Sequence, residues 1–173
     1  MGVVLSRLLQ TVKLQRDAFV WMDFNDRATG DAAMLVAGTQ VLIAIGLGLS
    51  LGELINPLTL ANILLGGLFF WVVYSGATYA VSRFLFDGHG TYAIYLRITG
   101  FAYPTLLVLI FVSLFISNPL LALVAGGAWF VVVVANGLTY VADLSIAKAA
   151  SSAIGGYVLM IIVQTIFGNV FAF

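Results

Sequence analysis

Cysteine is absent from this 173-residue sequence, and histidine occurs once, as His89. The absence of cysteine excludes disulfide bonds, thiolate metal sites and thiol catalysis. A single histidine leaves no histidine cluster for a metal ion. The sequence also lacks a GxxxxGK[ST] phosphate loop, a GxSxG motif and an HExxH motif. We therefore expect no enzyme activity, no catalytic residue, no cofactor and no metal site.

Charge is scarce as well, because only 8% of the residues are charged and the formal net charge is zero. A soluble domain carries roughly 25% charged residues. A neutral chain creates no general field that would attract nucleic acid. In contrast, 62% of the residues are hydrophobic, which is more than a water-soluble fold of this size can hide. The lipid bilayer is therefore the expected surroundings of this chain.

Five uncharged apolar stretches approach the ~20 residues that a helix needs to cross a bilayer. Backbone polar groups must be paired inside hydrocarbon, and the alternation of barrel strands is absent. The sequence therefore predicts an all-α integral membrane bundle of five transmembrane helices over residues 31–173, preceded by a cytoplasmic or interfacial segment at 1–30. The expected spans are residues 32–51, 60–80, 98–116, 120–141 and 153–171.

The third span is the least regular of the five. Pro104 lies near its start, and residues 92–99 are amphipathic enough to lie along the membrane interface before the chain enters the bilayer. A four-span alternative, in which the third segment re-enters the membrane from one side, stays open at this point.

Basic residues set the expected orientation, because short loops rich in Lys and Arg stay in the cytoplasm. With five spans, every basic residue falls on one side of the membrane. We therefore expect a multi-pass protein of the cell membrane, with a cytoplasmic N-terminus and with Phe173 outside. Glu53 is then the only external charge, so a partner must bind at the cytoplasmic face or inside the membrane. The basic residues are Arg7, Lys13, Arg16, Arg27, Arg83, Arg97 and Lys148.

The N-terminal segment has the spacing of an amphipathic helix. Its basic and polar side chains lie mostly opposite an apolar face, which is typical of a helix in the membrane interface. Such a helix either docks a partner or packs against the bundle. No apolar run of the kind found in a secretory signal precedes Ala32. The apolar face consists of Val4, Leu5, Leu8, Leu9 and Val12.

Two segments about 62 residues apart share a pattern: Asn-Pro-Leu, a glycine pair, Phe, a valine pair and Thr-Tyr. One begins at Asn56 and the other at Asn118, which suggests two parallel helical hairpins. Small residues let membrane helices approach closely, so we expect the glycine pairs to be packing points. These glycines are Gly66, Gly67, Gly126, Gly127, Gly155 and Gly156.

Deeper polar side chains are few, and none of them is ionisable. Gln40, Asn62, Asn136 and Gln164 fall within the expected spans. Each could form a hydrogen bond between helices, or the four could line a solute pathway.

The densest polar cluster is expected at the cytoplasmic ends of the helices. It is either a solvated interface with snorkelling cations and an aromatic belt or a recognition surface for a partner protein. The candidate partner-binding residues are Arg83, Asp87, His89, Tyr92, Arg97, Asp143 and Lys148.

The same region carries a family resemblance. Gly88-His89-Gly90-Thr91-Tyr92, then Leu96-Arg97, then Gly100-Phe101-Ala102-Tyr103-Pro104 resembles the central signature of the Yip family, multispan proteins named for interaction with Ypt/Rab GTPases. Leu144-Ser145-Ile146-Ala147-Lys148-Ala149 resembles the linker of that family before the last span. The resemblance implies five spans, a cytoplasmic N-terminus and a noncatalytic membrane adaptor.

The sequence departs from the family pattern in three places. No proline precedes Phe19, and Ala142-Asp143 stands where the family linker often has histidine. The long soluble N-terminal region of eukaryotic trafficking members is missing, which suggests a prokaryotic-type member. These departures weaken the transfer of GTPase binding.

Two functions follow as hypotheses. The first is an adaptor or scaffold whose cytoplasmic face binds another protein. The alternative is a small transporter or channel, built from repeated hairpins and assembled as a homo-oligomer. An intramembrane enzyme ranks third, because no catalytic pair is visible.

Overall fold

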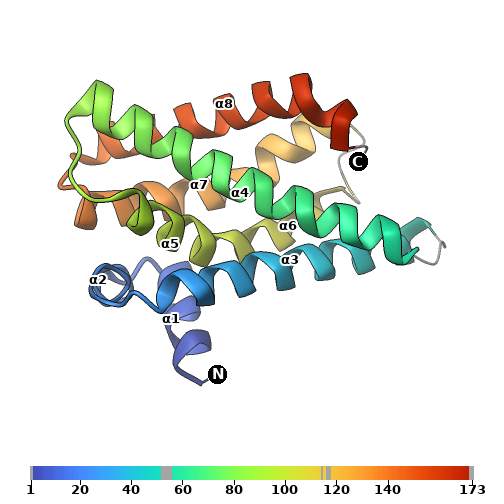
Figure 1. Cartoon of the computed structure of the whole chain (residues 1–173), viewed down its shortest axis with the longest axis horizontal. Coiled ribbons are helices and arrows are strands. Elements are labelled where there is room, and N and C mark those ends of the chain that lie inside the picture. The colour runs from blue at the N-terminus through green and yellow to red at the C-terminus, as the bar shows by residue number, and fades with distance from the viewer. Residues whose placement is uncertain (1, 52–55, 114, 116–117, 172–173) are drawn as a thin grey trace.

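The computed structural model describes residues 2–51, 56–113, 115 and 118–171. Within them the longer helices run alongside one another, and the two N-terminal helices, α1 and α2, lie across their direction (Figure 1). Glu53 and Phe173, which were expected outside the cell, are not among the described residues. The elements are α1 (Gly2–Val12), α2 (Arg16–Phe24), α3 (Ala28–Leu51), α4 (Pro57–Phe86), α5 (Tyr92–Ala102), the 3-10 helix η1 (Tyr103–Leu107), α6 (Val108–Ser113), α7 (Pro119–Val141) and α8 (Ile146–Phe171).

The prediction of a five-helix membrane bundle is confirmed. Five helical stretches of the described chain are long and apolar enough to cross a membrane: Ala28–Gly46, Pro57–Phe86, Tyr92–Val112, Val124–Val141 and Ile146–Val163. The third begins at Tyr92 rather than near residue 98, so residues 92–99 are its first turns. Figure 1 shows α5, η1 and α6 continuing in one direction beside α3, which does not support the re-entrant alternative.

Pro104 explains why the third span looked irregular. Proline has no N–H and its ring crowds the preceding turn, so the α-helix ends at Ala102 and tightens into η1. The N–H of Tyr103 bonds to the carbonyl of Gly100 instead. The hydroxyl of Thr105 donates to the carbonyl of Ala102 at 2.7 Å. The backbone groups freed at the proline are therefore paired locally, and the helix continues.

The third span is the centre of the bundle. Its apolar window is 56% buried, against 28% for the first, second and fifth spans. Hydrogen bonds between small polar groups join it to α4. The indole N–H of Trp71 donates to Thr99 Oγ1 at 3.0 Å, and the hydroxyls of Ser75 and Thr99 are 2.6 Å apart. On the other side of α4, the rings of Tyr74 and Phe130 are 4.9 Å apart.

The second N-terminal helix belongs to this core. Phe19 and Met22 of α2 are fully buried, and the Phe19 ring lies so close to Gly137 of α7 that a Cβ at residue 137 would approach it to 2.8 Å. Of the two interpretations of the N-terminal segment, packing against the bundle therefore describes α2. Its first helix, α1, keeps Leu5 and Leu9 more than half exposed.

Candidate functional site

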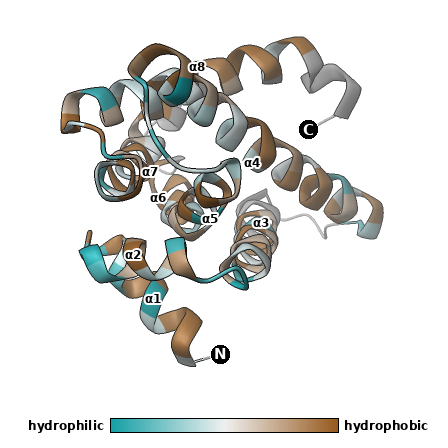
Figure 2. Cartoon of the chain, turned by 60° about the vertical axis from the view of Figure 1, so that its left-hand side comes forward, coloured by the Kyte–Doolittle hydropathy of each residue, from teal (hydrophilic) through white to brown (hydrophobic). Residues whose placement is uncertain are grey.

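Two connecting loops meet at one end of the bundle, where α4 and α7 finish and where α5 and α8 begin. The N–H of His89 donates to the carbonyl of Ala142 at 3.0 Å, which ties the loop between α4 and α5 to the loop between α7 and α8. The guanidinium of Arg83 donates to the carbonyl of Gly88 at 3.1 Å. Much of the hydrophilic surface lies at this end and on α1 and α2 (Figure 2).

An aspartate in the left-handed conformation ends each of the two helices that enter these loops. Asp87 has φ 56° after α4, and Asp143 has φ 53° after α7. Aspartate tolerates this region better than most residues with a Cβ. Each helix also begins alike, since Asn56 and Asn118 accept the backbone N–H of Leu58 and Leu121. The shared start and end signals fit the proposed hairpin repeat, and duplication itself stays a prediction.

Five of the seven candidate partner-binding residues are exposed and surround the two joined loops. We call this set the loop surface: Arg83, Asp87, His89, Asp143 and Lys148.

The sixth candidate, Tyr92, is partly buried and is engaged within the bundle. Its hydroxyl donates to the carbonyl of Val72 at 3.0 Å, and its ring packs edge-on against Tyr79. Tyr92 therefore supports the edge of the loop surface and offers less of its own side chain.

The seventh candidate, Arg97, lies elsewhere. It is 6% exposed and directs its guanidinium at the N-terminal segment. It donates to the carbonyls of Met22 at 2.9 Å and Asp23 at 3.3 Å, which end α2, to Asp26 Oδ1 at 2.6 Å and to Thr29 Oγ1 at 2.9 Å. These contacts leave little of the Arg97 side chain for a partner, and its role in partner binding stays a prediction. A cation suits the carbonyl end of a helix, so Arg97 fastens α2 and the start of α3 to α5.

The glycine pairs lie where helices approach one another. Added Cβ atoms would overlap Gln40 at Gly67, Leu109 at Gly126, Tyr157 at Gly127 and Thr78 at Gly156. The contact at Gly155 is less tight, since an added Cβ would meet Val81 at 3.4 Å. Gly66 is buried within α4.

The three deeper polar side chains that the structure describes, those of Gln40, Asn62 and Asn136, differ in their surroundings. Gln40 Nε2 donates to the hydroxyl of Tyr103 at 2.7 Å and lines a cavity of about 210 Å³ between the spans. Asn62 is exposed on α4. Asn136 Oδ1 is buried without a hydrogen-bond partner among the described residues. The side chain of Gln164 lies outside the description.

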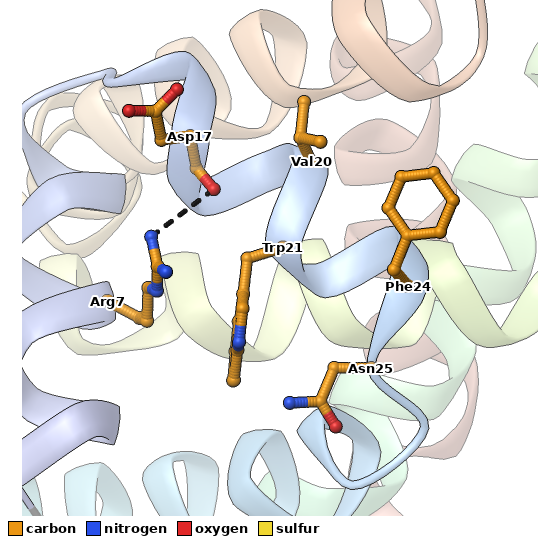
Figure 3. A pocket seen from close by; sticks show the side chains of 6 residues that line it. All are labelled: Arg7, Asp17, Val20, Trp21, Phe24 and Asn25. Carbon is orange, nitrogen blue, oxygen red and sulfur yellow. Dashed lines mark hydrogen bonds between the residues drawn. The ribbon is translucent and has the colours of Figure 1, made fainter.

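Sequence reasoning missed a pocket beside α1. It has a volume of about 560 Å³ and is lined by Arg7, Asp17, Val20, Trp21, Phe24 and Asn25. Figure 3 shows the Arg7, Trp21 and Asn25 side chains around one space, with the backbone carbonyl of Asp17 facing Arg7 and the Asp17 carboxylate directed away from the guanidinium. Its sequence signal was weak, because residues of α1, α2 and the following turn meet only when α1 folds back against α2.

In the described ranges, His, Asp and Glu residues form no group of three that could hold a metal ion. Comparison with known protein families matches the Yip1 domain over residues 17–168. Neither the curated proteins nor the solved structures contain a match.

Proposed function

The chain belongs to the Yip1 domain family of multi-pass membrane proteins, and from this membership we propose that it is a noncatalytic adaptor. In this proposal the loop surface binds a partner protein in the cytoplasm. The bundle holds that surface at the membrane and takes no part in chemistry.

The ordered loop surface is the observation that supports this proposal best. The bond between His89 and Ala142 joins its two halves, and a left-handed aspartate follows each of α4 and α7. A surface that is already ordered loses less conformational entropy on binding than a flexible one. Both signs of charge are present on it, which favours specific pairing over general attraction to anions.

Exposed apolar side chains adjoin these charges. Phe84 and Leu85 near the end of α4 are 78% and 69% exposed, and Ile146 at the start of α8 is 62% exposed. Apolar anchors with a charged surrounding are common in protein interfaces. The combination therefore suits a partner that covers the loops and the adjoining helix ends together.

In this proposal the protein lies in the cell membrane and its loop surface faces the cytoplasm. The basic residues of the described chain all lie in α1, α2, the turns that follow these two helices, or the loop-bearing end of the bundle. By the positive-inside rule, the N-terminus is then cytoplasmic and the C-terminus is outside.

A charge-reversal experiment tests the adaptor proposal. A photoreactive amino acid replaces Ser145, which is exposed in the loop between α7 and α8, and crosslinked proteins from native membranes are identified by mass spectrometry. We expect one stoichiometric partner, lost in the Arg83→Glu/Lys148→Glu protein and kept in a Lys13→Glu control. Crosslinks to other copies of the chain alone would contradict the adaptor proposal and favour the transport alternative.

The transporter or channel alternative has one observation in its favour. Gln40, Tyr74, Tyr103 and Tyr157 bring polar atoms to the cavity between the spans. However, Asn62 is exposed on α4 rather than directed to this cavity. A continuous polar pathway therefore has less support than the loop surface. Solute flux in vesicles that falls in a Gln40→Ala protein would favour the alternative.

A further inference from the structure

The pocket beside α1 lies at the level where the bundle enters the membrane. Asn25 is in the turn just before α3 begins at Ala28, and Arg97, in the second turn of α5, reaches the same turn through Asp26. The Trp21 ring packs edge-on against Phe101, with centroids 6.0 Å apart. Tryptophan is enriched at the level of lipid headgroups, which agrees with a pocket at the membrane surface.

Three side chains bring hydrogen-bond donors to the pocket. Arg7 uses Nη1 for Gln10 at 2.9 Å and for the carbonyl of Asp17 at 3.4 Å, and it stacks over Trp21 at 5.4 Å. Among the described residues, nothing accepts from its Nε or Nη2. The same holds for the indole N–H of Trp21 and the amide nitrogen of Asn25. These donors suit a phosphate group.

An acceptor stands at the rim of the same pocket. The carboxylate of Asp17 is exposed and forms neither a hydrogen bond nor an ion pair with another described residue. In Figure 3 it belongs to the same residue whose backbone carbonyl faces Arg7, and it points away from the guanidinium. The pocket lining thus includes the donors of Arg7, Trp21 and Asn25 and, on Asp17, an exposed carboxylate that no described residue holds in place.

We propose that this pocket binds the headgroup of a phosphatidylethanolamine molecule of the inner leaflet. The phosphate accepts from Arg7, Trp21 and Asn25, and the primary ammonium donates to Asp17. Phe24, which is 83% exposed, and Val20 contact the glycerol and the upper acyl chains. The bound lipid then rests against the N-terminal helices. Arg7 precedes the part of the chain that matches the family, which starts at residue 17.

Charge complementarity favours this lipid over others. An anionic headgroup without an amine would meet the carboxylate of Asp17 unpaired, and a quaternary choline cannot donate a hydrogen bond to it. A soluble peptide is less favoured, because the pocket lies beside the bilayer, where phospholipid headgroups are far more concentrated.

Native mass spectrometry of the purified full-length chain tests the proposal. Dioleoyl phosphatidylethanolamine, phosphatidylcholine and phosphatidylglycerol are added separately, and the retained lipid is counted. One charge-assisted hydrogen bond decides between the headgroups, so we expect wild-type protein to retain phosphatidylethanolamine about tenfold better. The Asp17→Asn protein should lose this preference. The Arg7→Gln protein should retain all three lipids weakly.

Matched controls carry the same changes on exposed residues that do not line the pocket: Asp23→Asn and Arg27→Gln should behave as wild type. The Asp17 carboxylate makes no hydrogen bond or ion pair with another described residue, so Asp17→Asn decides the matter even if Arg7→Gln disturbs α1. Unchanged lipid preference in Asp17→Asn would overturn the proposal, as would better retention of phosphatidylglycerol by wild type. Full displacement by equimolar glycerophosphoethanolamine would identify a soluble ligand instead, and would also overturn it.

Discussion

Arg97 shows how much one buried cation can organise at the edge of a membrane bundle. Its guanidinium satisfies two carbonyls at the end of α2, the Asp26 side chain in the following turn and the Thr29 side chain at the start of α3. Asp26, its ionic partner, has a fully exposed side chain. An ion pair with one solvated member contributes little by itself. The bonds to the buried carbonyls therefore matter more than the ion pair.

Loss of the bonds to the carbonyls should therefore cost more stability than loss of the ion pair. Arg97→Gln should lower the free energy of unfolding by about 2–3 kcal/mol, because several charge-assisted hydrogen bonds are lost. Asp26→Asn should cost less than about 1 kcal/mol. Thermal unfolding in a mild detergent measures both, and proteolysis in the turn at residues 25–27 should accelerate only in Arg97→Gln. Equal losses in the two proteins would show that the ion pair carries the contact.

The sequence could not reveal this role for Arg97. Its hydrogen-bond partners lie 68 to 75 residues earlier in the chain, and a lone arginine beside tyrosines has the pattern of a solvated interface. The exposure of His89 was easier to predict from the sequence, because glycines on both sides indicate an exposed turn. His89 is indeed exposed. Local patterns locate a side chain near a membrane surface, whereas its partners depend on how distant helices pack.

At the scale of elements, the contact between α4 and α8 depends on one glycine more than on its neighbour. A Cβ at Gly156 would overlap Thr78 and approach its backbone nitrogen to 3.0 Å, whereas a Cβ at Gly155 would meet Val81 at 3.4 Å. Gly156→Ala should therefore destabilise the bundle by about 1–3 kcal/mol through overpacking. Gly155→Ala should stay within about 0.5 kcal/mol, as is usual away from tight contacts. Thermal unfolding of the two purified proteins gives the comparison, and equal values would contradict it.

The aspartate caps give a second prediction for elements. Asp87 holds φ at 56°, where glycine has no steric penalty and a β-branched side chain has a large one. Asp87→Gly should leave stability unchanged or raised, and Asp87→Val should lower it by about 1–2 kcal/mol. Denaturation midpoints in detergent measure this difference. A Val protein as stable as the Gly protein would mean that α4 ends differently.

The long apolar helices could be predicted from the sequence because crossing a bilayer demands both length and a lack of charge. The role of α2 could not. Its nine residues, Arg16–Phe24, are too few and too polar to span, so the pattern favours an interfacial helix. Phe19 and Met22 are nevertheless buried, since the small Gly137 of α7 leaves room for the Phe19 ring. The third span begins earlier in the structure than the sequence predicts. Neighbouring helices cover the polar side chains of its first turns, as α7 covers Phe19 of α2.

At the scale of the whole molecule, orientation decides which end meets the cytoplasm, and every functional proposal here depends on it. The chain lacks cysteine, so single cysteines can report sidedness without background. Asn118→Cys lies at the start of α7, and Lys148→Cys lies near the start of α8 at the opposite end (Figure 1). The cysteine-free parent controls for non-specific labelling.

The positive-inside rule gives the expected outcome. A membrane-impermeant maleimide should label Asn118→Cys in intact cells and Lys148→Cys only after the membrane is opened. This result would put the loop surface, Arg97 and the headgroup pocket on the cytoplasmic side together, because one bundle carries all three at the same end. The reverse pattern would turn them outward. A cytoplasmic partner and an inner-leaflet lipid would then both be excluded, whatever their affinity for the isolated protein.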